Sequence, residues 1–153
     1  MNKELCSGVV QNIKKEIEKW VFMIMKMDIR CHFYGEEFSP KVFEQLTGLT
    51  LVKKIEVGET LRVGINKGNP SDYGSGQLCP PIEFQGNEDF GLGWMALNLT
   101  KQIDVLRRCG TEKIELVIGV WYDKQCNLVF EPESIKLIGE LGIPLQVSCY
   151  EGY

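Results

Sequence analysis

The 153 residues contain a single histidine, His32, for acid–base chemistry, and its surroundings do not favour catalysis. The nearest nucleophile is Cys31, in a segment where apolar and polar residues alternate. Because successive residues of a strand point to opposite faces, Cys31 and His32 cannot form a nucleophile–base pair. The chain also has no Gly-x-Ser-x-Gly nucleophile elbow. We expect His32 to face solvent, and we expect the protein to have no catalytic residues and not to be an enzyme.

Phosphate and metal chemistry have equally little support. The tightest glycine cluster is Gly74-Ser75-Gly76. A phosphate-binding P-loop ends in Gly-Lys-Ser/Thr and leads into a helix, whereas Gln77-Leu78-Cys79-Pro80-Pro81 follows here and the prolines interrupt a helix. The six cysteines are scattered without a Cys-x-x-Cys pair, so a zinc site is not expected. The sequence predicts no metal and no other cofactor.

The charge of the chain bears on its partners. The formal net charge is −4, and an acidic surface repels phosphate backbones, so nucleic-acid binding is not expected. The N-terminus does not resemble a signal peptide, and the apolar run at 20–25 is too short to span a bilayer. We therefore expect a cytoplasmic protein with reduced thiols and no membrane contact.

Hydrophobic periodicity predicts the elements of the first half. An amphipathic helix is expected over 4–20, so that 1–22 forms an N-terminal helical extension. Strict alternation predicts a strand over 23–34. Ser39 and Gly48 suit the two ends of a short helix with Pro40 in its first turn. The predicted buried face of this helix consists of Val42, Phe43 and Leu46.

The second half begins with a glycine- and proline-rich segment at 62–93, which predicts a long loop of functional or mobile character. The strand at 114–122 is apolar on both faces and is expected to be central and buried on both sides. The other expected elements are a strand at 93–97, a helix at 99–109, a hairpin strand at 128–130, a helix from Pro132 to Gly142 burying Ile135, Ile138 and Leu141, and a strand at 145–150.

These elements predict an α+β fold in one domain, 1–153, with a mixed or antiparallel sheet and helices packed on it. From residue 93 onward the expected order is β-α-β-β-α-β, the ferredoxin-like arrangement. The sequence does not indicate an oligomeric state.

The span from about Met27 to Tyr150 resembles a bacterial family of uncharacterised proteins known as domain of unknown function 4279. The resemblance rests on caps, turns and core strands: Phe38-Ser39-Pro40, Leu46-Thr47-Gly48-Leu49, Gly93-Trp94, the strand at 114–122, Phe130-Glu131-Pro132, Leu141-Gly142-Ile143 and Val147-Ser148-Cys149-Tyr150. The family has no established activity and therefore implies no catalytic residue. What the resemblance implies is the character of a toxin-neutralising immunity protein.

Two functional hypotheses follow. The first is a non-catalytic protein-binding module, in concrete terms an immunity protein that occludes the active site of a basic toxin such as a nuclease. Complementary charge would speed its capture, with Asp72, Tyr73, Glu88 and Asp89 as contacts. The alternative is a small-molecule or nucleotide-binding domain, or a cryptic enzyme, with 62–93 as a lid over the sheet. A basic toxin gene upstream would favour the first hypothesis, and a ligand near Trp94 the second.

Overall fold

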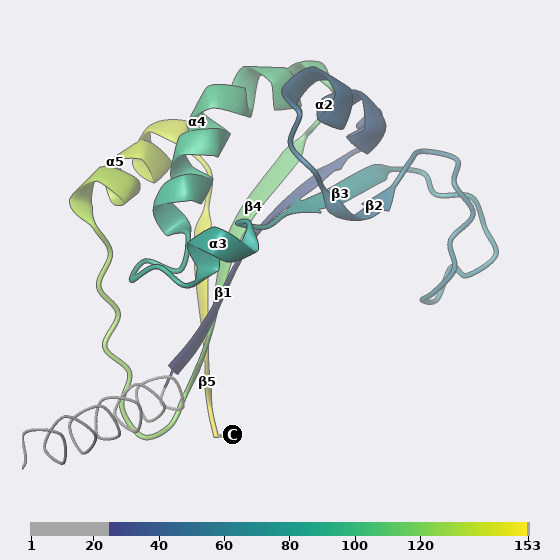
Figure 1. Ribbon diagram of the computed structural model, residues 1–153. Helices are drawn as coiled ribbons and strands as arrows, with labels where there is room; N and C mark the ends of the chain where they lie inside the picture. Colours follow the sequence, from purple (N-terminus) through teal and green to yellow (C-terminus); the bar gives the residue numbers. More distant parts are fainter. Residues whose placement is uncertain (1–24, 153) are drawn as a thin grey trace, which may run out of the picture.

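The computed structural model describes residues 25–152, so the helix expected at 4–20 and the extension 1–22 lie outside the described residues. The protein is α+β, with a five-stranded mixed sheet. The longer helices α2, α4 and α5 pack on one face of this sheet (Figure 1). The elements are β1 (Met25–Gly35), α2 (Pro40–Thr47), β2 (Val52–Ile55), β3 (Gly74–Leu78), α3 (Ile82–Gln85), α4 (Leu92–Arg108), β4 (Lys113–Tyr122), α5 (Pro132–Leu141) and β5 (Leu145–Glu151).

The strands lie in the order β2-β3-β1-β4-β5, which puts β1 in the middle of the sheet. β1 runs antiparallel to both of its neighbours, and β2 runs antiparallel to β3. Among the described strands only β4 and β5 are parallel neighbours, and α5 supplies the crossover that such a pair requires. The predicted strands at 23–34, 114–122 and 145–150 are confirmed as β1, β4 and β5 over the residues described.

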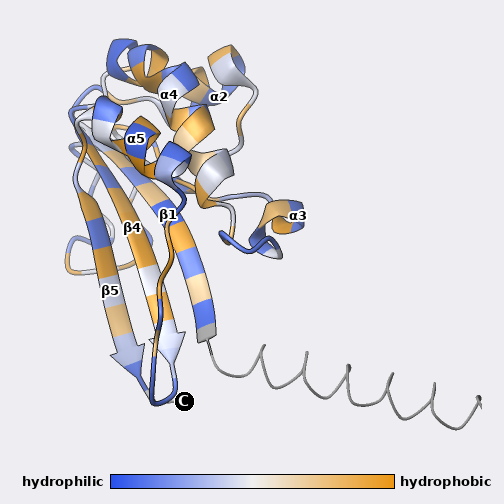
Figure 2. Cartoon of the chain, turned by 90° about the vertical axis from the view of Figure 1, so that its left-hand side faces the viewer, coloured by the Kyte–Doolittle hydropathy of each residue, from blue (hydrophilic) through white to orange (hydrophobic). Residues whose placement is uncertain are grey.

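The hydrophobic core lies between the sheet and the helices. Alternate residues of β1 and β4 point into it, and α4 covers them with a buried stripe at helical spacing. Figure 2 shows that the helices cover only part of the length of β1, β4 and β5. The fully buried core side chains include Cys31, Phe33, Phe38, Phe43, Met95, Leu99, Leu106, Leu116, Ile118 and Val120.

The predicted ends of α2 are confirmed. The Ser39 hydroxyl accepts a hydrogen bond from the backbone N–H of Val42, and Gly48 adopts the left-handed conformation with φ +71°. The buried face was predicted too wide, because Val42 and Leu46 are exposed. This short helix touches the core through Phe43, whose ring lies 5.8 Å from that of Phe33.

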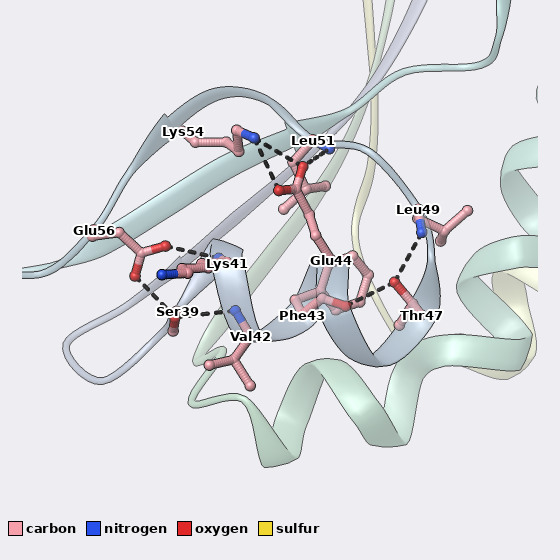
Figure 3. Close-up of polar contacts among 10 residues, drawn as sticks. All are labelled: Ser39, Lys41, Val42, Phe43, Glu44, Thr47, Leu49, Leu51, Lys54 and Glu56. Atoms are coloured by element: carbon pink, nitrogen blue, oxygen red, sulfur yellow. Dashed lines mark hydrogen bonds and ion pairs between the residues drawn. The ribbon is translucent and has the colours of Figure 1, made fainter.

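Polar contacts tie α2 to β2 (Figure 3). Glu44 accepts a hydrogen bond of 2.7 Å from the backbone N–H of Leu51 and forms an ion pair of 2.9 Å with Lys54. Glu56 accepts from the Ser39 hydroxyl and from the backbone N–H of Lys41, at 2.9 and 2.7 Å. These contacts hold the β2 segment beside α2.

The prediction of a continuous loop at 62–93 is wrong. Residues 74–78 form β3, an interior strand, and the segment also contains α3 and the first residues of α4. The glycines mark close backbone packing here, because a Cβ on Gly74 would lie 1.7 Å from the carbonyl oxygen of Phe38.

Two predicted strands of the second half are also wrong. Residues 93–97 belong to α4, whose start is disguised by Gly91 and Gly93. Residues 128–130 pair with no strand, although the alternating Cys126, Leu128 and Phe130 pack against the core. The order β-α-β-β-α-β is therefore not found from residue 93 onward. The strands β1 to β4 have this order instead, with α2 and α4 as the two helices, if the one-turn α3 is set aside. The elements α5 and β5 come after them.

The last helix was placed correctly, since α5 has Pro132 in its first turn and left-handed Gly142 at its end. Ile138 and Leu141 are buried as predicted, but Ile135 is exposed because α5 meets α4 along a narrow stripe. β4 is central as predicted, but only one of its faces is buried, since the helices lie on a single side of the sheet.

Candidate functional site

The face of the sheet opposite the helices is the first candidate for function. Residues of β1 that alternate with the core residues point to it, as the sequence predicted. These residues are Lys26, Asp28, Arg30, His32 and Tyr34. Within residues 25–152 no helix covers this face, so these five side chains are half-buried or exposed.

His32 was expected simply to face solvent, but two neighbouring side chains hold its ring in place on this face. Its Nδ1 lies 3.0 Å from the amide nitrogen of Gln77 on β3 and 3.5 Å from the hydroxyl of Tyr34. Burial lowers the pKa of His32 below its usual 6.5, against a smaller opposing effect of the Glu115 carboxylate. The ring is therefore neutral at pH 7, and Nδ1 accepts a hydrogen bond from Gln77.

Cys31 points into the core, as the alternation predicted. Its side chain is fully buried, and burial raises the pKa of its thiol far above the usual value. A thiol that is both buried and protonated cannot attack a substrate. The pair Cys31–His32 therefore has no catalytic geometry.

The environment of His32 leads to a pH prediction. Because the folded state holds the pKa of His32 below 6.5, the unfolded chain binds its proton first as the pH falls. The contribution of the neutral ring to stability is thus complete above pH 6.5 and is lost as the pH falls from 6.5 through the folded pKa. We expect the free energy of unfolding, measured by urea denaturation between pH 7 and about 5, to fall less in His32→Gln than in the wild type. Parallel pH profiles for the two proteins would contradict this assignment.

An aromatic pair lies on the same open face. Trp121 and Tyr150 are register partners on β4 and β5, and their rings lie 5.3 Å apart at 19°. The Trp121 indole folds over Gly119, where a Cβ would come within 2.8 Å of it. The Lys26 ammonium group lies 5.7 Å from the centre of that indole. Beside the pair is a shallow hollow of about 260 Å³ lined by Asp28, Arg30, His32, Val117, Gly119, Trp121, Ser148 and Tyr150.

A second, larger hollow lies between the α3–α4 connection and the segment that leads into α5. Its volume is about 750 Å³, and it is lined by Gly86, Asn87, Glu88, Asp89, Val129 and Glu131. Three of these six residues carry carboxylates and none is basic. We call this surface the acidic hollow.

The three carboxylates have different roles. Asp89 accepts hydrogen bonds from the backbone N–H groups of Gly91 and Gly93, at 3.0 and 2.8 Å, and so caps the first turn of α4. Glu131 precedes α5, but its side chain makes no capping hydrogen bond. Within the described part of the chain, the side chains of Glu88 and Glu131 form neither a hydrogen bond nor an ion pair, so both are available to a partner.

The four contact residues expected from the sequence do not form one surface. Asp72 and Tyr73 immediately precede β3, whereas Asp89 lies beyond its other end, where it accepts a hydrogen bond from Gly91, a residue whose Cβ, if added, would lie 2.6 Å from Pro80. Five residues of strand separate the two ends by roughly 16 Å. The structure instead places Glu88 and Asp89 together with Glu131 around the acidic hollow. Glu131 was not among the contact residues predicted from the sequence.

The remaining observations concern other classes of site. Residues 25–152 contain no cluster of three or more potential metal ligands among His, Cys, Asp and Glu. None of the described helices combines the length and apolar character needed to cross a bilayer. Comparison with protein-family models, curated proteins and solved structures gave no match for this chain.

Proposed function

We propose that the protein is a non-catalytic binding module that captures a basic protein through the acidic hollow. The observation that carries the proposal is the composition of this surface: three carboxylates and no basic residue around an accessible volume of about 750 Å³. Val129 also lines it and is 79% exposed. An exposed apolar residue within a charged rim is a common arrangement at protein interfaces.

Charge would act mainly on the rate of capture. Carboxylates of one sign in a concave surface attract a basic partner over several ångströms and raise the association rate. Asp89 is fixed by its hydrogen bonds to α4, so it contributes charge without a new conformational cost. Glu88 and Glu131 are the residues that would contact the partner directly.

The most concrete partner is a basic toxin domain, such as a nuclease, in the bacterial cytoplasm. Bound there, the module would occlude the active site and act as an immunity protein. The small size of the chain and its net charge of −4 support this proposal.

The element order and strand order of β1 to β4 support a ferredoxin-like classification for this part of the chain.

The charges of the hollow give a direct test. We expect the double variant Glu88→Lys, Glu131→Lys to associate at least about tenfold more slowly with a basic toxin domain encoded beside this gene, at low salt. Surface plasmon resonance across a salt series measures the rate, and co-expression in bacteria measures protection. Asp89 is left unchanged, because its replacement would also remove the cap of α4.

Asp72→Lys is the matched control. Each lysine of the double variant changes the charge by two units, and Asp72→Lys makes that change once, on an exposed residue at the other end of β3, so its association rate should stay near that of the wild type. If Asp72→Lys gave half of the double variant's effect on a logarithmic scale, the rate would depend on net charge alone. Unchanged rates in the double variant would remove the acidic hollow from the interface.

The hollow over Gly119 favours a second candidate, a small-molecule or nucleotide-binding domain, because the Trp121 and Tyr150 rings and the Arg30 side chain line it together. Its volume of about 260 Å³ would suit only a small ligand, since small-molecule pockets occupy roughly 300–1,000 Å³. The proposed lid at 62–93 is restricted, because residues 74–78 are hydrogen-bonded inside the sheet. Titration of the Trp121 fluorescence with nucleotides and aromatic acids tests this candidate, and a Trp121→Phe variant identifies the source of the signal.

A further inference from the structure

The two edges of the sheet differ in how they are protected. β2, at one edge, has only four residues, and two of them are Lys53 and Lys54. Lys53 adopts a left-handed conformation with φ +49°, and the register between β2 and β3 shifts at this point. A short, irregular and lysine-rich strand is the usual protection of an edge against pairing with another chain.

β5, at the opposite edge, has none of these features. It has seven residues, pairs with β4 in unbroken register, and contains neither proline nor lysine. Its only charged residue is Glu151, at its end. Val147 and Tyr150 are strong β-formers. No described strand pairs with the outer edge of β5, which Figure 2 shows as the outermost strand.

The side chains of β5 are also incompletely covered. Val147 is the register partner of Ile118 and points to the same face, yet it is 39% exposed, whereas Ile118 is fully buried. Cys149, the next residue on this face, is exposed as well. Apolar surface and unpaired backbone groups therefore coincide along a single strand.

We propose that β5 pairs antiparallel with β5 of a second copy of this chain, so that the two sheets become continuous. The sequence of the strand is self-complementary about Ser148, where a two-fold axis would pass. Val147 then lies opposite Cys149 of the other copy, Gln146 opposite Tyr150, and Leu145 opposite Glu151. Each pair joins residues of the same face, so the helices of both copies lie on one side of the joined sheet.

Charge and hydrogen bonding support a second copy as the occupant. This register places no like charges opposite each other, because Glu151 meets Leu145. The backbone N–H and C=O groups on the outer edge of β5 gain partners, and Val147 and Tyr150 lose exposed area. The interface uses neither Glu88 nor Glu131, so this inference is independent of the acidic hollow.

The first test compares equivalent substitutions at the two edges. We expect light scattering after size-exclusion chromatography of the full chain to give twice the chain mass of 17.4 kDa for the wild type. Val147→Lys should be monomeric, because a lysine on an edge strand blocks pairing. Val52→Lys on β2 is the control, since Val52 is 43% exposed and lies at the protected edge, and it should remain dimeric. Circular dichroism checks that both variants are folded.

The second test examines the register and does not depend on a destabilising change. In a Cys149→Ser background, Ser148→Cys should form an intermolecular disulfide under mild oxidation, because residues directly opposite in an antiparallel pair have Cα atoms about 4.5–5.5 Å apart. Gln146→Cys in the same background should not, since its partner is Tyr150. A monomeric wild type, a dimer lost equally in Val52→Lys, or equal cross-linking of the two cysteine variants would overturn the proposal.

Discussion

Gly74→Ala is expected to unfold the protein. A Cβ on Gly74 would lie 1.7 Å from the carbonyl oxygen of Phe38 and 2.7 Å from its carbonyl carbon. Both are backbone atoms, so no rotation of a side chain can make room. Relief would require β3 to separate from the segment that enters α2. We expect a loss above about 5 kcal/mol, which reaches the lower end of the range for the total stability of folded domains.

The position is critical because three segments meet there through their backbones. Gly35 is the register partner of Gly74, and a Cβ on Gly35 would lie 2.0 Å from the carbonyl oxygen of Gly110. The backbone N–H of Ser39 donates to the carbonyl of Cys109 at 3.2 Å, in the same corner. Glycine therefore joins the ends of β1, β3 and α4 at distances that no larger residue permits.

Gly86→Ala is the matched control in the same glycine-rich segment. Gly86 has a right-handed helical conformation with φ −83°, and a Cβ there would meet nothing within 4 Å. Its effect should stay within about 0.5 kcal/mol, as for most surface substitutions. Urea denaturation of the two variants gives the comparison. A Gly74→Ala protein that folds with a loss below about 1 kcal/mol would show that the corner can relax.

The same glycines explain why the sequence did not reveal β3. A strand is normally recognised by alternating apolar residues, but Gly74-Ser75-Gly76-Gln77-Leu78 offers only one large apolar side chain. Glycine enters this strand because other backbone segments and the Leu51 side chain occupy the space beside it. Close approach between residues far apart in the sequence leaves no local pattern, whereas the caps at Ser39 and Gly48 are local and were predicted correctly.

The candidate site likewise combines residues that the local sequence indicated with one that only tertiary packing brings there. Glu88 and Asp89 were predicted as contacts because they lie in an irregular, charged segment, and both line the acidic hollow. Their neighbour Glu131 was not recognised, since only the packing of α5 against α4 brings it to the acidic hollow. Tyr73 was grouped with them by proximity in sequence, although its ring lies near Tyr34, at 6.4 Å.

The prediction that β4 is buried on both faces is wrong, because its apolar residues occupy two different environments. Ile118 and its alternating neighbours Leu116 and Val120 lie under the helices and are fully buried. Val117 and Trp121 lie on the open face, where neighbouring side chains of the sheet cover them only in part. An apolar run indicates a central strand, but it does not distinguish a second layer of helices from cover within the sheet surface.

Ile118→Ala is expected to destabilise the protein by about 2–5 kcal/mol, the range for truncation of a buried aliphatic side chain. Ile118 is fully buried between its register partners Ile29 and Val147. Removing its side chain atoms leaves a cavity that the rigid strands on both sides cannot close. Urea denaturation measures the loss, and an unchanged m-value would show that the variant still unfolds from a compact state.

Val117→Ala, one residue away, is the control for this second substitution. Val117 points to the open face between Arg30 and Gln146 and is half-buried, so its truncation creates a surface depression that water fills. We expect its cost to be below about 1 kcal/mol, because the atoms removed contribute less burial and leave no closed cavity. If Val117→Ala were the more damaging of the two, a second layer would have to cover the open face. The difference between two adjacent residues therefore tests directly which side of β4 carries the core.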